Sequence, residues 1–447
     1  MRLFAKSVHL CALLLMAGSF AGCSMLSGII KPADKDRIPG ERIPVMAAEA
    51  KIEADPQVAN LQVVLPKPYR NADWAQPGGY PDNVLHHLEA GGNLQVLWRA
   101  DAGHGSNSSA RLTAVPIMAQ GTVFVLDSEG EVRAFNADTG DLKWERDLTP
   151  EDEDSEAGFG GGIAFDAGKI FVSTGFGFVA CLDAATGAEI WRYDAKVPFR
   201  AAPTVSEGRV YASTQENQLL ALSAADGRMQ WDVRGIAETA GMLGSTSPAV
   251  SGDVVVVPFT SGELFALRAT NGRTAWTDSL TRSGQKTALA GLNDIAGRPV
   301  IDRGLVVAIS HSGKLAAIDL STGERVWTQD IAGVQTPWVA GDFLYVVSME
   351  AELFCIHRKD GRVRWVTRLQ RYENEESRSG PIEWRGPVLV SDRLLLASST
   401  GEMISVSPYT GEILGRIEIP DGVFISPIVA NGTVFVLTDD AELIALR

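Results

Sequence analysis

The chain has 447 residues, of which 45% are hydrophobic, 21% charged and 7% aromatic, and it contains 45 glycines and 4 cysteines. This composition supports a large hydrophobic core, and it excludes a disordered chain, a collagen and a small domain held together by disulfides. The formal net charge of −15 gives a surface that repels nucleic acid, so we expect no nucleic-acid partner.

The N-terminus has the three parts of a secretory signal peptide. Residues 1–6 are positively charged, residues 8–17 are almost wholly apolar, and small residues then precede Cys23. The apolar run is too short to cross a bilayer as a helix, which takes roughly 20 residues. We therefore expect residues 1–22 to be a signal peptide that directs export and is then removed.

Residues 23–92 are expected to form a tether rather than a folded domain. They contain eight prolines and the pair Gly78-Gly79, and they show no sustained helical or strand period. The adjacent His86 and His87 are expected to be exposed polar side chains that point apart in an extended chain.

One pattern recurs from residue 93 to the C-terminus. Three short apolar segments separated by turns are followed by Asx-Gly or Thr-Gly, and a Trp stands four residues after the Gly. The recurring residues, counting the opening strand, are Trp98, Trp144, Trp191, Trp231, Trp276, Trp327 and Trp365, with Gly415 in the place of the Trp in the last copy. A period of roughly 45 residues with several strands in each unit predicts a β-propeller.

The number of blades follows from the third strand of each unit, which occurs eight times. The last unit ends at Arg447 without a fourth strand, whereas residues 94–99 form a Trp-bearing strand with no unit before it. Pairing these two segments completes the last blade and removes exposed sheet edges. The expected fold is therefore all-β, an eight-bladed β-propeller over residues 93–447, whose four-stranded antiparallel blades are closed into a ring by an N-terminal strand.

The repeated positions are expected to be structural. We expect the Trp residues to pack between blades, and the Asx-Gly turns to have positive φ at both central residues. A small residue in each third strand indicates a crowded position where neighbouring blades approach and only a small side chain fits. Cys181 and Cys355 occupy that position in blades two and six, so we expect buried thiols rather than a disulfide or a nucleophile.

The unit, approximately Pro-Val-x-x-Gly-x-Val-Phe-Val-x-x-x-x-Gly-x-Leu-x-Ala-Leu-x-x-x-x-Gly-x-x-x-Trp, resembles the pyrroloquinoline-quinone-type propeller repeat over about 355 residues. Two functional classes share this repeat: periplasmic quinoprotein dehydrogenases, and the BamB lipoprotein family of the outer-membrane β-barrel assembly machinery. The stretch Trp74-Ala75-Gln76-Pro77-Gly78-Gly79 and the spacing from Leu94 to Trp98 occur in related form in both classes. The fold alone therefore does not separate them.

The residues that quinoprotein chemistry would need are not evident. Dehydrogenases of this shape hold a quinone on Ca²⁺, and many cap it with a disulfide between adjacent cysteines, but the sequence has no Cys-Cys pair. Its six His residues have no metal-site spacing, and we find no nucleophile–base pair or catalytic carboxylates. We therefore expect a protein that is not an enzyme and has no cofactor and no metal. The alternative is a lipid-anchored periplasmic quinoprotein dehydrogenase.

The stretch Ala21-Gly22-Cys23 resembles the lipobox of bacterial lipoproteins, although Phe20 stands where Leu is usual. The resemblance implies lipid attachment at Cys23, and several acyl chains anchor a protein stably to a membrane. Ser24 stands where lipoproteins retained in the inner membrane usually have Asp. This implies a protein anchored in the outer membrane and facing the periplasm.

The resemblance to the BamB family also implies an interface. In that family the propeller docks on a POTRA domain of the barrel-inserting protein BamA, through two consecutive loops that join the outer strand of one blade to the inner strand of the next. The matching stretches here are residues 240–248 and 292–299, where Leu243 and Ala296 replace a family Arg and a family Asp. The residues expected to contact the partner are Met242, Leu243, Gly244, Asn293, Asp294 and Arg298. The alternative is that both loops have no partner and that their Gly and Asp residues serve turns.

The implied function is that of a scaffold that binds BamA and acts with the other subunits of the assembly complex to insert β-barrel proteins. Two mechanisms stay open: the propeller orients the POTRA domains, or it passes nascent barrel strands along by edge pairing. The acidic residues 151–156 are expected to be a solvated loop, and residues 371–385, rich in Glu and Arg, are a candidate second contact.

Overall fold

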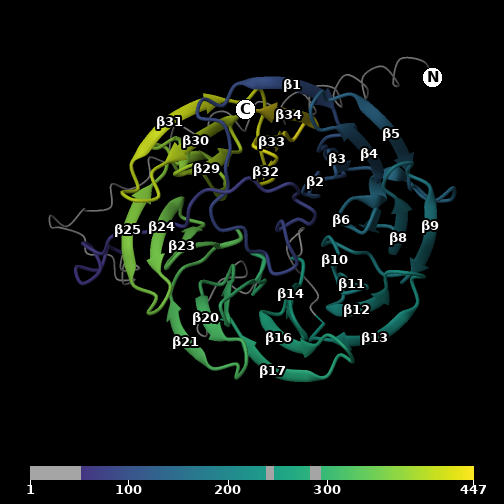
Figure 1. The fold of residues 1–447 in the computed structure, drawn as a ribbon, viewed down its shortest axis with the longest axis horizontal. Helices are drawn as coiled ribbons and strands as arrows, with labels where there is room; N and C mark the ends of the chain where they lie inside the picture. The colour runs from purple at the N-terminus through teal and green to yellow at the C-terminus, as the bar shows by residue number, and fades with distance from the viewer. Residues whose placement is uncertain (1–51, 238–245, 282–292) are drawn as a thin grey trace, which may run out of the picture. The chain divides into compact units, whose positions relative to one another are not determined.

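The computed structural model describes residues 52–237, 246–281 and 293–447. Within them, eight four-stranded antiparallel sheets follow one another around a ring (Figure 1). This confirms the eight-bladed propeller that the repeat predicts. No helix in this described part of the chain is long and apolar enough to cross a membrane.

The blades are numbered in chain order, and the strands of blades one to seven run from the innermost to the outermost. Blades one to three contain β2 (Ile117–Ala119), β3 (Thr122–Leu126), β4 (Glu131–Asn136), β5 (Leu142–Asp147); β6 (Gly161–Asp166), β7 (Lys169–Thr174), β8 (Phe178–Asp183), β9 (Glu189–Asp194); and β10 (Thr204–Ser206), β11 (Arg209–Ser213), β12 (Gln218–Ser223), β13 (Met229–Arg234). Blades four to six contain β14 (Ala249–Ser251), β15 (Val254–Pro258), β16 (Glu263–Arg268), β17 (Thr274–Ser279); β18 (Val300–Asp302), β19 (Leu305–Ile309), β20 (Leu315–Asp319), β21 (Arg325–Gln329); and β22 (Trp338–Ala340), β23 (Phe343–Val347), β24 (Glu352–His357), β25 (Val363–Arg368). Blade seven contains β28 (Trp384–Val390), β29 (Arg393–Ser398), β30 (Glu402–Val406) and β31 (Ile413–Glu418), and outside the blades lie the 3₁₀ helix η1 (Ser155–Gly158) and the hairpin of β26 (Tyr372–Asn374) and β27 (Ser379–Pro381).

Blade eight joins the two ends of the propeller sequence, as predicted. Its inner strands β32 (Ile428–Ala430), β33 (Thr433–Leu437) and β34 (Glu442–Leu446) are C-terminal, and its outer strand β1 (Val96–Asp101) is N-terminal. β1 runs antiparallel to β34, with Trp98 opposite Ala445. The ring is therefore closed by backbone hydrogen bonds between the two ends of the propeller.

The recurring Trp residues lie between blades, which confirms their predicted role. Each indole stacks on the Gly of the next blade's turn and donates its Nε1 hydrogen to a carbonyl of that blade, over 2.7–3.2 Å. A Cβ added to Gly227 would lie 2.6 Å from Cε3 of Trp191. The pairs are Trp98 with Gly140, Trp144 with Gly187, Trp191 with Gly227, Trp231 with Gly272, Trp276 with Gly323, Trp327 with Gly361, and Trp365 with Gly411.

These turns differ from the prediction in one respect. Only the Gly has a positive φ, between 71° and 78° in the seven turns, whereas Asp226 and its counterparts do not. In blade one the loop is longer than a two-residue turn, because it closes with a hydrogen bond from Gly140 N to Asn136 O, and the strand pairing shifts at the adjacent Ala134. A longer hairpin loop with a bulge needs a single left-handed residue.

In every blade but the seventh, the small residue of the third strand lies directly across from the Trp of the outer strand. Cys181 pairs with Trp191 and Cys355 with Trp365, and both cysteines are fully buried free thiols. Burial raises the pKa of Cys181 to about 11, so this thiol is protonated at neutral pH. The prediction of small buried thiols is therefore confirmed, and in these two blades the cysteine pairs with the Trp of its own blade's outer strand.

Residues 52–92 are not an extended tether, and this part of the sequence interpretation is wrong. They belong to the same compact unit as the propeller, which spans Ile52–Arg447. Trp74, Leu85 and Leu88 are at most 3% exposed. His87, expected to be exposed, is 1% exposed: its Nδ1 lies 2.7 Å from Pro66 O, and its Nε2 accepts a hydrogen bond from Asp392 N. Residues 23–51 lie outside the described residues.

Residues 69–90, here called the hub segment, cross the centre of the ring, where Figure 1 shows them in dark blue. They hydrogen-bond to the inner strand of every blade, over distances of 2.7–3.2 Å. In blade order from one to eight, the pairs are Trp74 with Met118, Ala75 with Phe165, Gln76 with Val205, Pro81 with Val250, Asp82 with Ile301, His86 with Trp338, Leu88 with Leu389, and Asn71 with Val429. Backbone groups at the centre of the ring are thus satisfied by the chain's own N-terminal segment.

Candidate functional site: the loop face

Antiparallel blades give the propeller two different faces. The loops that join an outer strand to the next inner strand lie on the same side as the turns between second and third strands, and we call this side the loop face. The hub segment contacts the opposite side, since it pairs next to the turns between first and second strands: Asn71 O, for example, accepts from Asn431 N in the turn after β32. The described chain also begins on that opposite side, where Asp55 N donates to Val363 O at the start of β25.

The two predicted partner loops join β13 to β14 and β17 to β18, so they are consecutive. Their described ends lie on the loop face, whereas residues 238–245 and 282–292 lie outside the described residues. The first is anchored where it leaves blade three: the Asn217 amide donates to Ile236 O over 2.6 Å, and Ile236 N donates to the Glu263 carboxylate over 2.8 Å. The Ile236 side chain is 60% exposed. The loop therefore starts with an apolar side chain held at the surface.

The predicted site residues fall into two groups. Met242, Leu243 and Gly244, like the predicted lipid-attachment residue Cys23, lie outside the described residues. Asn293, Asp294 and Arg298 are described, and all three lie in the second loop. The structure thus brings one half of the predicted set to the loop face.

The described end of this second loop, residues 293–299, is packed against the propeller. Asp294 is 3% exposed, its carbonyl accepts from His311 N, and the next residue, Ile295, is 2% exposed in the core of blades four and five. Asn293 is half-buried beside Gly262. The buried Asp294 therefore fixes the loop, although the sequence comparison with the family suggested a surface contact.

Arg298 lies at the end of the same loop, two residues before β18, and is half-buried. Its backbone N donates to the hydroxyl of Thr336 over 3.3 Å, and its Nη1 lies 3.5 Å from the same oxygen. Burial lowers the pKa of Arg298 to about 10. The guanidinium is still charged at neutral pH, since that value lies well above 7.

The loop face has features that sequence reasoning did not find. A cavity of about 190 Å³ between blades six and seven is lined by Gln335, Ser348, Trp384 and Arg385 among others. Residues 371–385, a candidate second contact, form the β26–β27 hairpin, which lies beside a wider groove of about 990 Å³ lined partly by Arg99, Glu373, Glu402 and Glu418. Of the acidic residues 151–156, residues 151–154 are exposed, as expected of a solvated loop, whereas Ser155 and Glu156 are half-buried at the start of η1.

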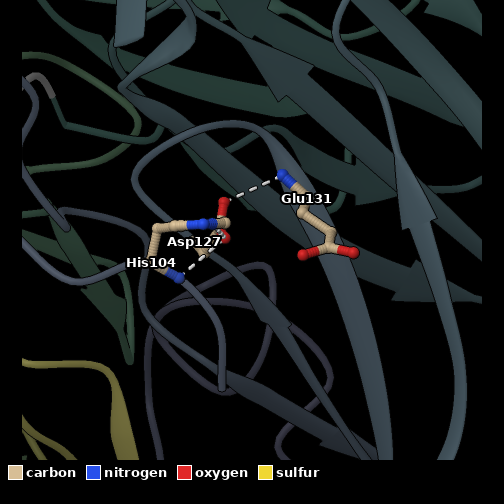
Figure 2. A group of neighbouring side chains, drawn as sticks. All are labelled: His104, Asp127 and Glu131. Carbon is tan, nitrogen blue, oxygen red and sulfur yellow. Dashed lines mark hydrogen bonds and ion pairs between the residues drawn. The ribbon is translucent and has the colours of Figure 1, made fainter. Parts of the chain in front are cut away.

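One group of side chains resembles a metal site, and Figure 2 shows it: His104, Asp127 and Glu131. Both Asp127 oxygens are already used, because one accepts from Glu129 N and Glu131 N and the other from His104 N and Nδ1, over 2.9–3.0 Å. Glu131 also pairs with Arg133 at 2.8 Å. In blade six, Ser348 occupies the same turn position and accepts from Glu352 N. We therefore interpret Asp127 as a turn residue that holds the loop around His104.

Comparison with known proteins agrees with the repeat. The sequence pattern of the family described as outer membrane protein assembly factor BamB matches residues 45–158, 151–367 and 370–447. The outer membrane protein assembly factor BamB of Moranella endobia is 24% identical over 357 residues, which are 79% of this chain and 90% of that protein.

Two solved structures have the same fold. The crystal structure of BamB from Moraxella catarrhalis has a TM-score of 0.66 at 18% identity, covering 79% of this chain and all of that chain. Quinohemoprotein alcohol dehydrogenase from Comamonas testosteroni has a TM-score of 0.65 at 13% identity, and the match covers 85% of this chain and 81% of that chain. These likenesses show the fold alone, since enzymes and assembly factors share it. The family pattern, in contrast, matches nearly the whole propeller and the hub segment, and the chain belongs to the family of outer membrane protein assembly factor BamB.

Proposed function

We propose that this protein is a non-catalytic scaffold of the outer-membrane β-barrel assembly complex, which binds a POTRA domain of BamA and helps to insert β-barrel proteins. The observation that carries the proposal is the match to the family pattern, which covers residues 45–158, 151–367 and 370–447. No cofactor, metal or catalytic step is part of the proposal. The fold it shares with dehydrogenases does not favour catalysis, because function depends on the site and not on the fold.

The partner surface in this proposal is the loop face, with Met242, Leu243 and Gly244 in the first loop and Asn293, Asp294 and Arg298 in the second. The hub segment contacts the opposite face, so this segment does not cover the loop face. The exposed Ile236 supplies an apolar group beside the first loop. An apolar group with a charged neighbour is the composition of many protein interfaces.

The anchor in this proposal is lipid attached to Cys23 after removal of residues 1–22, with the propeller held at the periplasmic side of the outer membrane. A short tether raises the effective concentration of the propeller near a membrane-bound partner. Asp55, near the start of the described chain, is on the face opposite the loops, where its backbone N donates to Val363 O. Changing Cys23 to Ala is expected to move the protein from the membrane fraction to the soluble periplasmic fraction.

The test of the partner is purification of the full-length protein from detergent-solubilised membranes, with the bound proteins identified by mass spectrometry. We expect BamA and the other complex subunits with the wild type, and their loss with the double variant Met242→Asp, Leu243→Asp. Ile190→Asp is the matched control, because Ile190 is 47% exposed on the outer strand β9 at the rim. Absence of BamA from the wild-type sample would overturn the proposal, and loss with the control would overturn the assignment to the loop face.

A further inference from the structure

Burial lowers the pKa of four arginines in the described residues: Arg200, Arg298, Arg385 and Arg393. A guanidinium taken out of water is costly unless oxygen atoms compensate its charge. The partners of these four side chains therefore indicate which of them are satisfied within the protein and which are not.

Three of the four have strong acceptors. Arg200 donates to the carbonyl of Phe159 and stacks over the Phe159 ring, with its Cζ 4.1 Å from the ring centre. Arg385 forms an ion pair with Glu383. Arg393, on the face opposite the loops, donates to the carbonyls of Gly91 and Gly92. Each of these charges thus meets a carbonyl or a carboxylate.

Arg298 is the exception among them. Its side chain reaches a single hydroxyl, Thr336 Oγ1 at 3.5 Å. The buried Nε has no hydrogen-bond partner in Arg298, Arg385 or Arg393, so the difference lies in the terminal nitrogens, which meet a carbonyl or a carboxylate only in the other arginines. No carboxylate or carbonyl of the described residues accepts from the Arg298 guanidinium. Arg298 is half-buried at the loop face, two residues before β18. Within the described residues, most donors of its guanidinium are therefore unused.

We propose that Arg298 is the receptor for one carboxylate, an Asp or Glu side chain that a protein partner inserts between blades five and six on the loop face. This inference rests on the proposed function, because it needs a protein docked on that face. A carboxylate fits the planar guanidinium through two parallel hydrogen bonds. A polyanion such as nucleic acid does not fit, since the whole chain carries a net charge of −15.

Stability and partner binding should respond differently to the loss of the Arg298 guanidinium. Substituting a residue that stabilises the fold lowers the melting temperature. Removing a buried charge that has no counterion, in contrast, leaves the stability unchanged or raises it. We therefore expect Arg298→Gln to melt no lower than the wild type, and to bind the partner at least 10-fold more weakly. Arg298→Lys, which keeps the charge without the fork, is expected to have an intermediate affinity.

The experiment titrates full-length protein in detergent against the purified periplasmic region of BamA from the same organism, at two salt concentrations, with thermal unfolding of each variant alongside. Affinity of the wild type should fall more steeply with salt than that of Arg298→Gln, because one ion pair is missing in the variant. Arg393→Gln is the matched control. It removes a buried arginine from the opposite face, so its melting temperature should fall while its affinity stays that of the wild type.

Each outcome decides a different point. If the wild type binds and Arg298→Gln binds equally well, the carboxylate receptor is overturned and the proposed function stands. If Arg298→Gln lowers the melting temperature as Arg393→Gln does, Arg298 is a structural residue and the inference is also overturned. If the wild type does not bind the BamA region at all, the proposed function fails, and with it this inference.

Discussion

At the scale of single residues, the propeller depends on one contact that is repeated between blades. The indole of one blade occupies the space that a side chain at the Gly of the next blade would need. Two structural constraints therefore favour glycine at this position. Its φ is left-handed, and its missing Cβ makes room for the ring. The sequence showed both residues as a repeat, but only the structure showed that they touch each other across blades rather than within one.

The two constraints can be separated by two substitutions. Gly208 has φ of +74° with nothing within 4 Å of an added Cβ, whereas Gly227 has φ of +72° and would meet Trp191. Gly208→Ala should lower the free energy of unfolding by about 1–2 kcal/mol, which is the cost of placing an alanine in the left-handed region. Gly227→Ala should lower the free energy of unfolding by roughly 1–3 kcal/mol more than Gly208→Ala, because the indole of Trp191 has to move. Denaturant unfolding measures both, and equal losses would contradict the interlocking role of the indole.

His104 gives a prediction on pH. Its hydrogen bond to the Asp127 carboxylate raises the pKa of His104 above its ordinary value near 6.5 in the folded protein. Folding thus favours the protonated form of His104. The hydrogen bond therefore makes its full contribution to stability below about pH 6.5, and this contribution is lost as the pH rises through the pKa of His104 in the folded protein. The melting temperature of the wild type should exceed that of His104→Gln by more at pH 5.5 than at pH 8.5. The effect should be small because the side chain is 54% exposed, and a constant difference across this range would refute it.

At the scale of elements, the hub segment is the main departure from the sequence interpretation. Its prolines and its lack of period suggested a tether, yet its polar groups pair with inner strands of all eight blades. A segment that lies across strand ends contacts a new blade every few residues, so its apolar side chains need not follow the period of a strand or a helix. The candidate interface has a similar limit, because burial of Asp294 depends on its packing against blade five.

Gln76 tests the hub segment by itself. Its side chain is 5% exposed, donates to Val205 O over 2.7 Å and accepts from Val205 N over 3.1 Å. Gln76→Ala leaves both backbone groups of the inner strand unpaired, so we expect a loss of about 2–4 kcal/mol in the free energy of unfolding. Gln230→Ala is the control, since Gln230 accepts only from the exposed side chain of Arg209, and it should cost less than about 0.5 kcal/mol. A similar cost for both changes would mean that the hub contact contributes little.

At the scale of the whole molecule, closure of the ring explains the one copy that lost its Trp. Gly415 pairs with Ser405 in the outer strand of blade seven, where the other blades have Trp opposite a small residue. The next blade has no turn after its third strand, because β34 ends at Leu446 and the outer strand comes from the N-terminus. An indole at position 415 would therefore have no turn glycine to stack on.

Truncation tests the boundary of the folded unit. The sequence interpretation places the start of the propeller at residue 93, whereas the compact unit starts at Ile52. A chain of residues 52–447 should unfold cooperatively at the temperature of the full-length protein. A chain of residues 93–447 keeps β1 but lacks the hub segment, so it should melt at a clearly lower temperature or aggregate, because inner-strand groups lose their partners. Equal melting of the two chains would show that the hub segment is dispensable.

The sequence by itself determined the number of blades, the closing strand and the structural role of Trp98 and its counterparts. These follow from a local pattern that repeats, and each copy confirms the others. Only the tertiary structure decided the role of residues 69–90, the burial of Asp294 and the partners of Arg298. These depend on which segments distant in the sequence meet in space, and a single unrepeated segment contains no internal copy from which such contacts can be inferred.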